Sequence, residues 1–224
     1  MEEPTASPVT PLLIPPYGGR LVDLLAGDDE RREASARAAR LPSIQLSARS
    51  LCDLELLATG AFSPLDRFMG RADYLRVVED MRLSNGLLFP VPITLPVSDT
   101  RGLAEGVEVA LRSPHNDVVA LMRIEELWGW DLAHEAGHVL GTTNVSHPFV
   151  AEMHAWGKTY ISGALTVVAL PKHHDFVDLR RTPAQVRAAL TAKGFGQVVA
   201  FQTCSPLHRV YEEMTKRALQ NIDG

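Results

Sequence analysis

The spacing of apolar residues in the first part of the chain predicts helices. Leucines recur at helical intervals between Ser47 and Ala58, so we predict a helix that Ser47 caps. A charged, alanine-rich stretch over 28–40 predicts another helix. Asp73 is expected to cap a third helix, which runs through Leu83. Several helices are therefore expected ahead of the first strands.

The next part of the chain changes to short apolar runs that suit strands. The run over 87–97 contains three prolines, a pattern typical of edge or bulged strands. Further runs predict strands over 107–112, 118–124 and 161–170. We expect these strands to form a compact mixed barrel, with the helices before it.

The end of the chain predicts a helix, a strand and a second helix. Thr182 and Gln185 form a capping box, with proline at the first helical position. The apolar run over 198–201 predicts a buried parallel strand, and Ser205 is expected to cap the helix after it. A doubly wound nucleotide-binding domain needs about 100–150 residues. We therefore expect residues 173–224 to be only the start of such a domain.

Composition narrows the classes of partner. A hydrophobic fraction of 46% supplies a core, and a net charge of −5 argues against nucleic acid or an anionic membrane surface. Cys52 and Cys204 lie far apart, which fits free thiols in a reducing cytosol. The acidic first residues do not resemble a signal peptide, and no apolar run reaches the roughly 18–20 residues of a membrane span. We expect a cytoplasmic protein.

The junction between the predicted strand and the final helix is a candidate anion site. Free backbone N–H groups and the helix dipole at a helix start both favour negative charge. His208 would lie in the first turn and face the anion. The alternative is an ordinary α/β packing unit in which His208 is only a cap residue.

A second candidate centre lies in the middle of the chain. His134-Glu135-Ala136-Gly137-His138 is a His-Glu-x-x-His pattern, which on a helix puts two imidazoles on one face for zinc. Glu135 would be the general base of a zinc metallopeptidase. Asn144 stands where the extended form of this pattern has its third ligand. The predicted helix, over 131–140, is also short.

Several segments, in the same order, resemble the ATP sulfurylase (sulfate adenylyltransferase) family. The matching segments are Pro16–Val22, Leu51–Leu57, Gly60–Asp66, Phe68–Met69, Gly141–Asn144, His147–Pro148 and Val199–Thr203. The resemblance implies a pseudouridine-synthase-like (PUA-like) barrel followed by a Rossmann-like nucleotidyltransferase domain. It also implies a reaction that joins sulfate to the α-phosphate of ATP and releases pyrophosphate. The family has a charged helix without a metal at the His-Glu-x-x-His position, so we expect no metal there.

The resemblance divides the expected α+β fold into three parts. We predict a disordered Pro-rich tail over 1–16 and a PUA-like mixed β-barrel with flanking helices over 17–172. Residues 173–224 are expected to hold the first strand and helix of a Rossmann-like α/β nucleotidyltransferase domain. The implied substrates are sulfate and ATP with magnesium, with no tightly bound cofactor. The implied partner is a second copy or the remainder of a sulfurylase/adenylylsulfate kinase polypeptide.

The family's active-site motif reads Gln-x-Arg-Asn-Pro-x-His-x-x-His, and this chain departs from it at three positions. Cysteine stands in place of Arg, serine in place of Asn and tyrosine in place of the second His. The implied substrate-binding residues are Gln202, Thr203, Cys204 and Ser205, and the implied catalytic residues are His208 and Tyr211.

These departures weaken oxyanion binding. A thiol at Cys204 has one weak donor and no charge, and losing one charge-assisted hydrogen bond costs roughly 1.5–3 kcal/mol. We expect Cys204 to be a buried small residue in place of the Arg rather than a nucleophile. Tyr211 cannot carry a positive charge at neutral pH. Removing one transition-state donor lowers a rate by about 10²–10³-fold. We therefore expect an impaired or inactive sulfurylase, or alternatively a non-catalytic assembly or regulatory module.

Overall fold

The computed structural model describes residues 13–224. This part of the chain forms two compact units, of which the larger is Tyr17–Leu179. The smaller unit contains Arg180–Gly224 together with residues 13–16. Most of the tail predicted over 1–16 lies outside the described residues.

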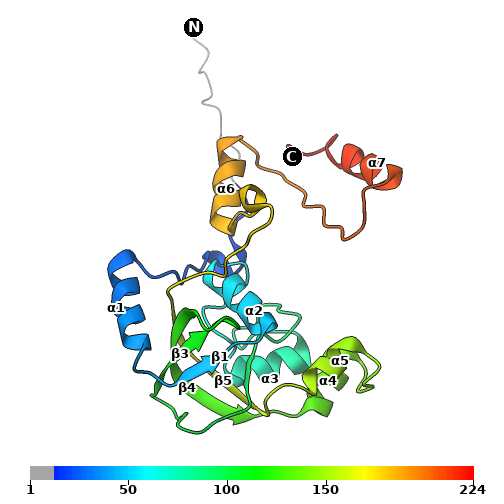
Figure 1. The fold of residues 1–224 in the computed structure, drawn as a ribbon. Helices are drawn as coiled ribbons and strands as arrows, with labels where there is room; N and C mark the ends of the chain where they lie inside the picture. Colours follow the sequence, from blue (N-terminus) through cyan, green and yellow to red (C-terminus); the bar gives the residue numbers. More distant parts are fainter. Residues whose placement is uncertain (1–12) are drawn as a thin grey trace. The chain divides into compact units, whose positions relative to one another are not determined.

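The larger unit combines a five-stranded sheet with helices (Figure 1). Its strands are β1 (Ser43–Gln45), β2 (Leu95–Val97), β3 (Glu108–Arg112), β4 (Val118–Gly129) and β5 (Thr159–Val167). Its α-helices are α1 (Asp28–Ala38), α2 (Ala48–Ala58), α3 (Arg71–Asp80), α4 (Leu132–Leu140) and α5 (Pro148–Met153), and its 3₁₀ helices are η1 (Tyr17–Gly19) and η2 (Val177–Leu179). The smaller unit contains α6 (Pro183–Ala192) and α7 (Arg209–Ala218). Among the described residues, no helix is both long enough and apolar enough to cross a membrane.

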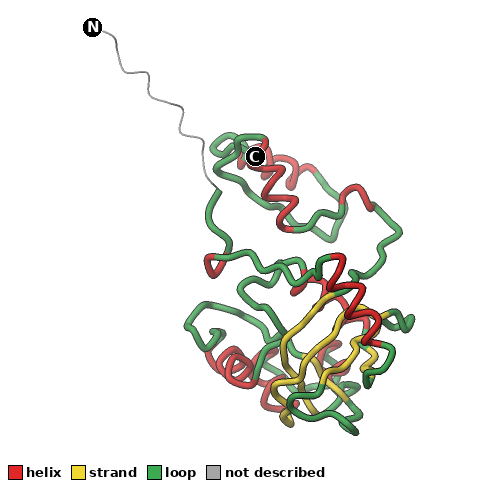
Figure 2. The backbone as a smooth tube through the Cα atoms, turned by 90° about the vertical axis from the view of Figure 1, so that its left-hand side faces the viewer, coloured by secondary structure: helices red, strands yellow, loops and turns green. Residues whose placement is uncertain are grey.

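The sheet is mixed and has the order β1-β3-β4-β5-β2. β1 pairs with β3 in parallel, and the other neighbours are antiparallel. Figure 2 shows that the strands curl into a half-barrel. The predicted mixed barrel therefore takes the form of a curled half-barrel with β1 and β2 at its edges.

Strand lengths differ from the prediction. In the proline-containing run over 87–97, only Leu95–Val97 forms a strand. Pro90 and Pro92 lie outside this strand. Pro96 lies within it, which an edge strand tolerates although proline has no N–H to donate to a ladder. β4 continues beyond the predicted residue 124 to Gly129, and its pairing with β5 shifts register between Ile124 and Glu126. This bulge lets one long strand follow the curl of the sheet.

Alternation along the strands decides which helix covers which face. Val109 and Leu111 of β3 enter the main core. Ala110, between them, packs on the other face against Ala34 and Ala38 of α1. The small side chains let helix and sheet approach closely, so a helix of mostly charged residues is held by a narrow alanine face.

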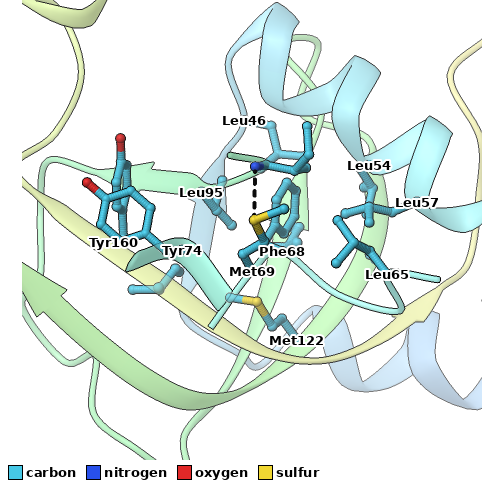
Figure 3. Close-up of a cluster of buried hydrophobic side chains, with 14 of the residues drawn as sticks. Leu46, Leu54, Leu57, Leu65, Phe68, Met69, Tyr74, Leu95, Met122 and Tyr160 are labelled. Carbon is cyan, nitrogen blue, oxygen red and sulfur yellow. Dashed lines mark hydrogen bonds between the residues drawn. The ribbon is translucent and has the colours of Figure 1, made fainter. Parts of the chain in front are cut away.

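The main core lies between the sheet and α2 and α3 (Figure 3). Leu54 and Leu57 of α2 are buried there with Phe68 and Met69, which follow α2 in the chain. The backbone N–H of Ile93 points at the Met69 sulfur, 3.5 Å away. The segment that resembles the sulfurylase family therefore supplies much of this core.

Helix starts were predicted with mixed success. Ser47 caps α2 as predicted, because its hydroxyl accepts the backbone N–H of Ser50 at 3.0 Å. Asp73 does not cap α3, since Gly70 occupies that position. The Asp73 carboxylate instead accepts the backbone N–H and the hydroxyl of Ser84, at 2.7 and 2.6 Å. The predicted cap was wrong because a loop more distant in sequence uses the same carboxylate.

The smaller unit confirms the capping box but not the strand. The Thr182 N–H donates to Gln185 Oε1 at 2.9 Å, and the Gln185 N–H donates to Thr182 Oγ1 at 3.3 Å. The run over 198–201 is not part of a sheet, and Val198, Val199 and Phe201 are 40–51% exposed.

The predicted strand was wrong because a strand requires a neighbouring strand. Among the described residues, the backbone partners of this segment lie near Gly224. The Val199 N–H donates to the Gly224 oxygen at 2.9 Å, and the Asp223 N–H donates to the Gln197 oxygen at 3.0 Å. The apolar character of residues 198–201 predicted burial, but strand pairing also requires a neighbouring strand, which the local sequence pattern does not encode.

Candidate functional site

The segment predicted to bind oxyanions is exposed chain ahead of α7. Thr203 Oγ1 accepts the Ser205 N–H and donates to the Ser205 oxygen, both at 3.1 Å. Helix α7 begins at Arg209, and its N-cap residue is His208, which makes no side-chain capping bond. The prediction of Ser205 as the cap was therefore wrong. Cys204 is an exposed free thiol, so the prediction that it is buried was also wrong.

Two of the predicted site residues lie together. The rings of His208 and Tyr211 are stacked, with centroids 4.1 Å apart and an interplanar angle of 28°. Phe201 packs against Tyr211 at 5.4 Å between centroids. Gln202, in contrast, has an exposed side chain for which no hydrogen bond is found among residues 13–224. The structure thus brings the two predicted catalytic residues together and leaves Gln202 outside their contact.

The smaller unit has no interior around these residues. No residue from 180 to 224 is buried, and the same holds for residues 13–16. Hydrogen-bond donors in water stabilise a developing charge far less than donors in a water-excluded site. In this arrangement the predicted oxyanion site is open to solvent.

The residues of the second candidate centre, on α4, make hydrogen bonds that stabilise the helix and attach it to the core. Asp131 caps the helix by accepting the His134 N–H at 2.8 Å. Glu135 is only 2% exposed, and its Oε2 atom accepts the hydroxyls of Tyr74 and Tyr160 at 3.0 and 2.8 Å. Figure 3 shows the two tyrosines side by side. The core tyrosines thus hold one oxygen of this carboxylate, which gives Glu135 a structural role.

The two histidines of the pattern also make other contacts. Their ring centroids lie 4.3 Å apart, and His138 Nδ1 is 2.8 Å from the His134 backbone oxygen. Within the part of the chain that the structure describes, no three His, Cys, Asp or Glu side chains gather as metal ligands would. The geometry gives the metallopeptidase interpretation no support.

Burial shifts the pKa values of this aromatic and acidic cluster. Desolvation raises the pKa of Glu135, while the hydrogen bonds from Tyr160 and Tyr74 and the charge of Arg49 act in the opposite direction. Desolvation also raises the pKa values of Tyr74 and Tyr160, and the Glu135 charge adds to both shifts. Both tyrosines therefore remain neutral hydrogen-bond donors to Glu135.

Asp53 of α2 is a further, partly buried carboxyl group near this cluster, and no motif in the sequence points to it. Its side chain is 13% exposed, and its Oδ2 lies 3.8 Å from Arg49 Nε. Burial raises its pKa from 3.8 to about 6, Arg49 opposes the shift, and the charge of Glu152 on α5 adds to it. Because the folded-state pKa is raised, the contribution of Asp53 to stability falls as the pH rises from 3.8 to about 6, and the full cost of the ionised group is present above that pH.

Comparison with known proteins assigns the two units. A family model described as a PUA-like domain matches residues 14–170. A second family model, described as ATP-sulfurylase, matches residues 177–223. The chain belongs to the ATP sulfurylase family. This confirms the family resemblance seen in the sequence.

Members of the ATP sulfurylase family similar to this chain are longer. A sulfate adenylyltransferase of Symbiobacterium thermophilum is 43% identical over 213 residues, covering 94% of this chain and 54% of the relative. A sulfate adenylyltransferase of Phaeosphaeria nodorum is 43% identical over 211 residues, which cover 91% of this chain and 37% of that relative. A probable bifunctional SAT/APS kinase of Sorangium cellulosum is 41% identical over 214 residues, which cover 95% of this chain and 37% of that relative. The chain therefore spans about half the length of its relatives, or less.

A solved structure also has a fold similar to that of this chain. It is described as a hexameric APS kinase from Thiobacillus denitrificans and has a TM-score of 0.74 and 34% identity. The match covers 93% of this chain and 38% of that chain.

Proposed function

We propose that this chain acts in sulfate activation and that, by itself, it forms adenosine 5′-phosphosulfate slowly or not at all. The proposal that turnover is slow or absent rests on one observation. Cys204, which stands in the Arg position of the family motif, is an exposed thiol in a unit without buried residues. A sulfate ion there would meet neither a guanidinium at that position nor a dry pocket. Both deficits act against transition-state stabilisation.

The proposed substrates follow from the family. Sulfate and ATP with magnesium would bind around Gln202, Thr203, Cys204 and Ser205, with His208 and Tyr211 as the residues nearest the reacting phosphate. We propose that residues 177–223 belong to a Rossmann-like nucleotidyltransferase domain. The stacked rings of His208 and Tyr211 support a shared role, because a substrate phosphate at the start of α7 would meet both.

An activity assay tests the proposal. With ATP, magnesium and sulfate, pyrophosphate release by the purified chain is expected to be at least about 100-fold slower than by the Symbiobacterium sulfate adenylyltransferase. Cys204→Arg is expected to raise the affinity for sulfate by about tenfold, since it restores a charge-assisted contact. Cys52→Arg, which changes another exposed free cysteine, should leave sulfate binding unchanged. A wild-type rate within tenfold of the reference enzyme would disprove the impairment.

A second candidate function is that of a non-catalytic assembly module. Helix α7 exposes Val210 and Met214, with 59% and 53% of their surface accessible, above a shallow hollow of about 340 Å³. Exposed apolar faces of this kind often mark interaction surfaces. The relatives described as a bifunctional SAT/APS kinase and as a hexameric APS kinase suggest a homo-oligomer or a sulfurylase/kinase polypeptide as the partner.

Sizing of the native protein tests this candidate. Light scattering is expected to show self-association, which Val210→Ser with Met214→Ser weakens by removing apolar contact area. Val145→Ser, on an exposed loop of the larger unit, is the control and should not alter the mass. A monomer at every concentration, for wild type and variants alike, would exclude self-association through α7.

A further inference from the structure

A cavity in the PUA-like unit carries both signs of charge and an apolar wall. It has a volume of about 250 Å³. Arg49 and Asp53 of α2 and Glu135 of α4 line it. The apolar wall includes Val139, Leu140 and Trp156. All of these residues belong to the larger unit, and none belongs to the family's active-site motif.

Two aromatic rings hold the guanidinium of Arg49 in place, and its N–H groups donate no hydrogen bond within residues 13–224. It lies over the Phe149 ring at 4.2 Å and over the Trp156 ring at 5.4 Å, measured to the centroids. Its distance of 3.8 Å from Asp53 is too long for a hydrogen bond. Among residues 13–224 the guanidinium has no hydrogen-bond acceptor. A stacked guanidinium with free N–H groups is well suited to a carboxylate.

The two carboxyl groups of the cavity have unused acceptor capacity. In the described part of the chain, no side chain or backbone group donates a hydrogen bond to Asp53, although its side chain is only 13% exposed. Glu135 receives both tyrosine hydroxyls on Oε2, which leaves Oε1 for the cavity that this residue lines. Buried carboxylates without donors are unfavourable, and a ligand that carries N–H donors would satisfy them.

Charge and size together select the class of ligand. A simple anion would be repelled by Asp53 and Glu135, and a simple cation would leave the Arg49 N–H groups without an acceptor. A ligand that carries both charges and an apolar group matches all three surfaces of the cavity. The volume of about 250 Å³ is below the range of roughly 300–1,000 Å³ of pockets for drug-sized ligands, which excludes a whole nucleotide.

We propose that this cavity binds a free α-amino acid with an apolar side chain. The ligand carboxylate pairs with Arg49, and its ammonium group donates to Asp53 and Glu135. Its side chain lies against Leu140 and Trp156. The site is separate from the sulfurylase motif, so this proposal does not depend on the proposed function.

Titration calorimetry of the full chain tests the proposal. L-leucine, L-methionine and L-phenylalanine are the probes, and saturable binding of at least one is expected. Isoamylamine and isocaproate, which each keep one charge of leucine, should bind at least about tenfold more weakly because each leaves one charged side chain unpaired. Absence of saturable binding by all three amino acids at millimolar concentration would overturn the proposal. Equal binding of leucine and isoamylamine would also overturn it.

Variants distinguish the site from non-specific binding. Asp53→Asn is expected to weaken amino-acid binding at least about tenfold, because a neutral amide pairs less strongly with an ammonium group. The matched control is Asp80→Asn on α3, whose carboxylate pairs with Arg76 at 3.0 Å with the same i,i+4 spacing but is 49% exposed. Binding should be unchanged in this control. Unchanged binding in Asp53→Asn would count against the cavity.

A stability measurement separates lost binding from lost folding. At pH 7.5, Asp53→Asn should melt at or above the wild-type temperature, because it removes a buried carboxylate that is ionised above about pH 6. At pH 4 the difference should shrink, because folded wild type is then protonated at Asp53. A variant that folds better and binds less well is what the proposal requires. A variant that melts below wild type at pH 7.5 and also loses binding would contradict it, because Asp53 would then support the fold.

Discussion

Gly163→Ala is expected to lower the free energy of unfolding of the PUA-like unit by about 3 kcal/mol or more. Gly163 of β5 lies beside the bulge of β4. A Cβ at this position would stand 1.9 Å from the Arg123 backbone oxygen, 2.8 Å from the Arg123 carbonyl carbon and 3.0 Å from the Glu125 nitrogen. These neighbours are backbone atoms, so no side-chain rotation can relieve the clash. The central strand pair would have to separate.

Denaturation followed by tryptophan fluorescence measures this effect. All three tryptophans, Trp128, Trp130 and Trp156, lie in the larger unit, so the signal reports on that unit alone. Gly129→Ala in the same sheet is the control, because its Cβ would meet its nearest atom at 3.9 Å, an ordinary contact distance. Its change is expected to stay within about 1 kcal/mol. Equal stability of the two variants would refute the close approach at the bulge.

Glu135→Ala is expected to lower the free energy of unfolding by about 2–4 kcal/mol. The substitution leaves the hydroxyls of Tyr74 and Tyr160 without their acceptor, and both tyrosines are buried. An unsatisfied buried donor costs about 1–3 kcal/mol. Relief of the buried carboxylate's desolvation offsets part of this loss. The same fluorescence titration at pH 7 gives the measurement.

Glu135→Gln separates the hydrogen bonds from the charge. A glutamine keeps one carbonyl oxygen that can accept both hydroxyls, so a loss of about 1 kcal/mol or less is expected. If Glu135 instead served a metal, zinc would stabilise wild type, and both variants would lose that effect. A large loss in the glutamine variant alongside a small loss in the alanine variant would show that the tyrosine hydrogen bonds are not what makes Glu135 important.

The Glu135 prediction bears on the candidate sites because it concerns the contacts that hold α4 in place. Glu135 joins α4 to Tyr74 of α3 and to Tyr160 of β5. The same carboxylate lines the cavity proposed for an amino acid. A ligand whose ammonium group reaches Oε1 would add to this network, and we therefore expect ligand binding to raise the stability of the larger unit.

Local hydrogen bonding explains which elements were predictable. Ser47 caps α2 and Thr182 begins the capping box of α6, and each partner lies three residues away. Family membership was equally accessible, because ordered segments from residue 16 to 203 carry it. The resemblance also predicts, without any structure, that Cys204 stands in the Arg position of the family motif.

Long-range contacts explain the rest. The run over 198–201 has a strand's composition, yet a strand exists only where another strand pairs with it, and no strand among the described residues does so there. The His-Glu-x-x-His pattern suits zinc or a packed helix equally well, and two distant tyrosines decided between them. The approach of Arg49 and Asp53 to Glu135 depends on how α2 and α4 pack against one sheet, which no local pattern encodes. The sequence by itself therefore determined the caps of α2 and α6 and the family, and the tertiary structure alone decided strand pairing and the charged cavity.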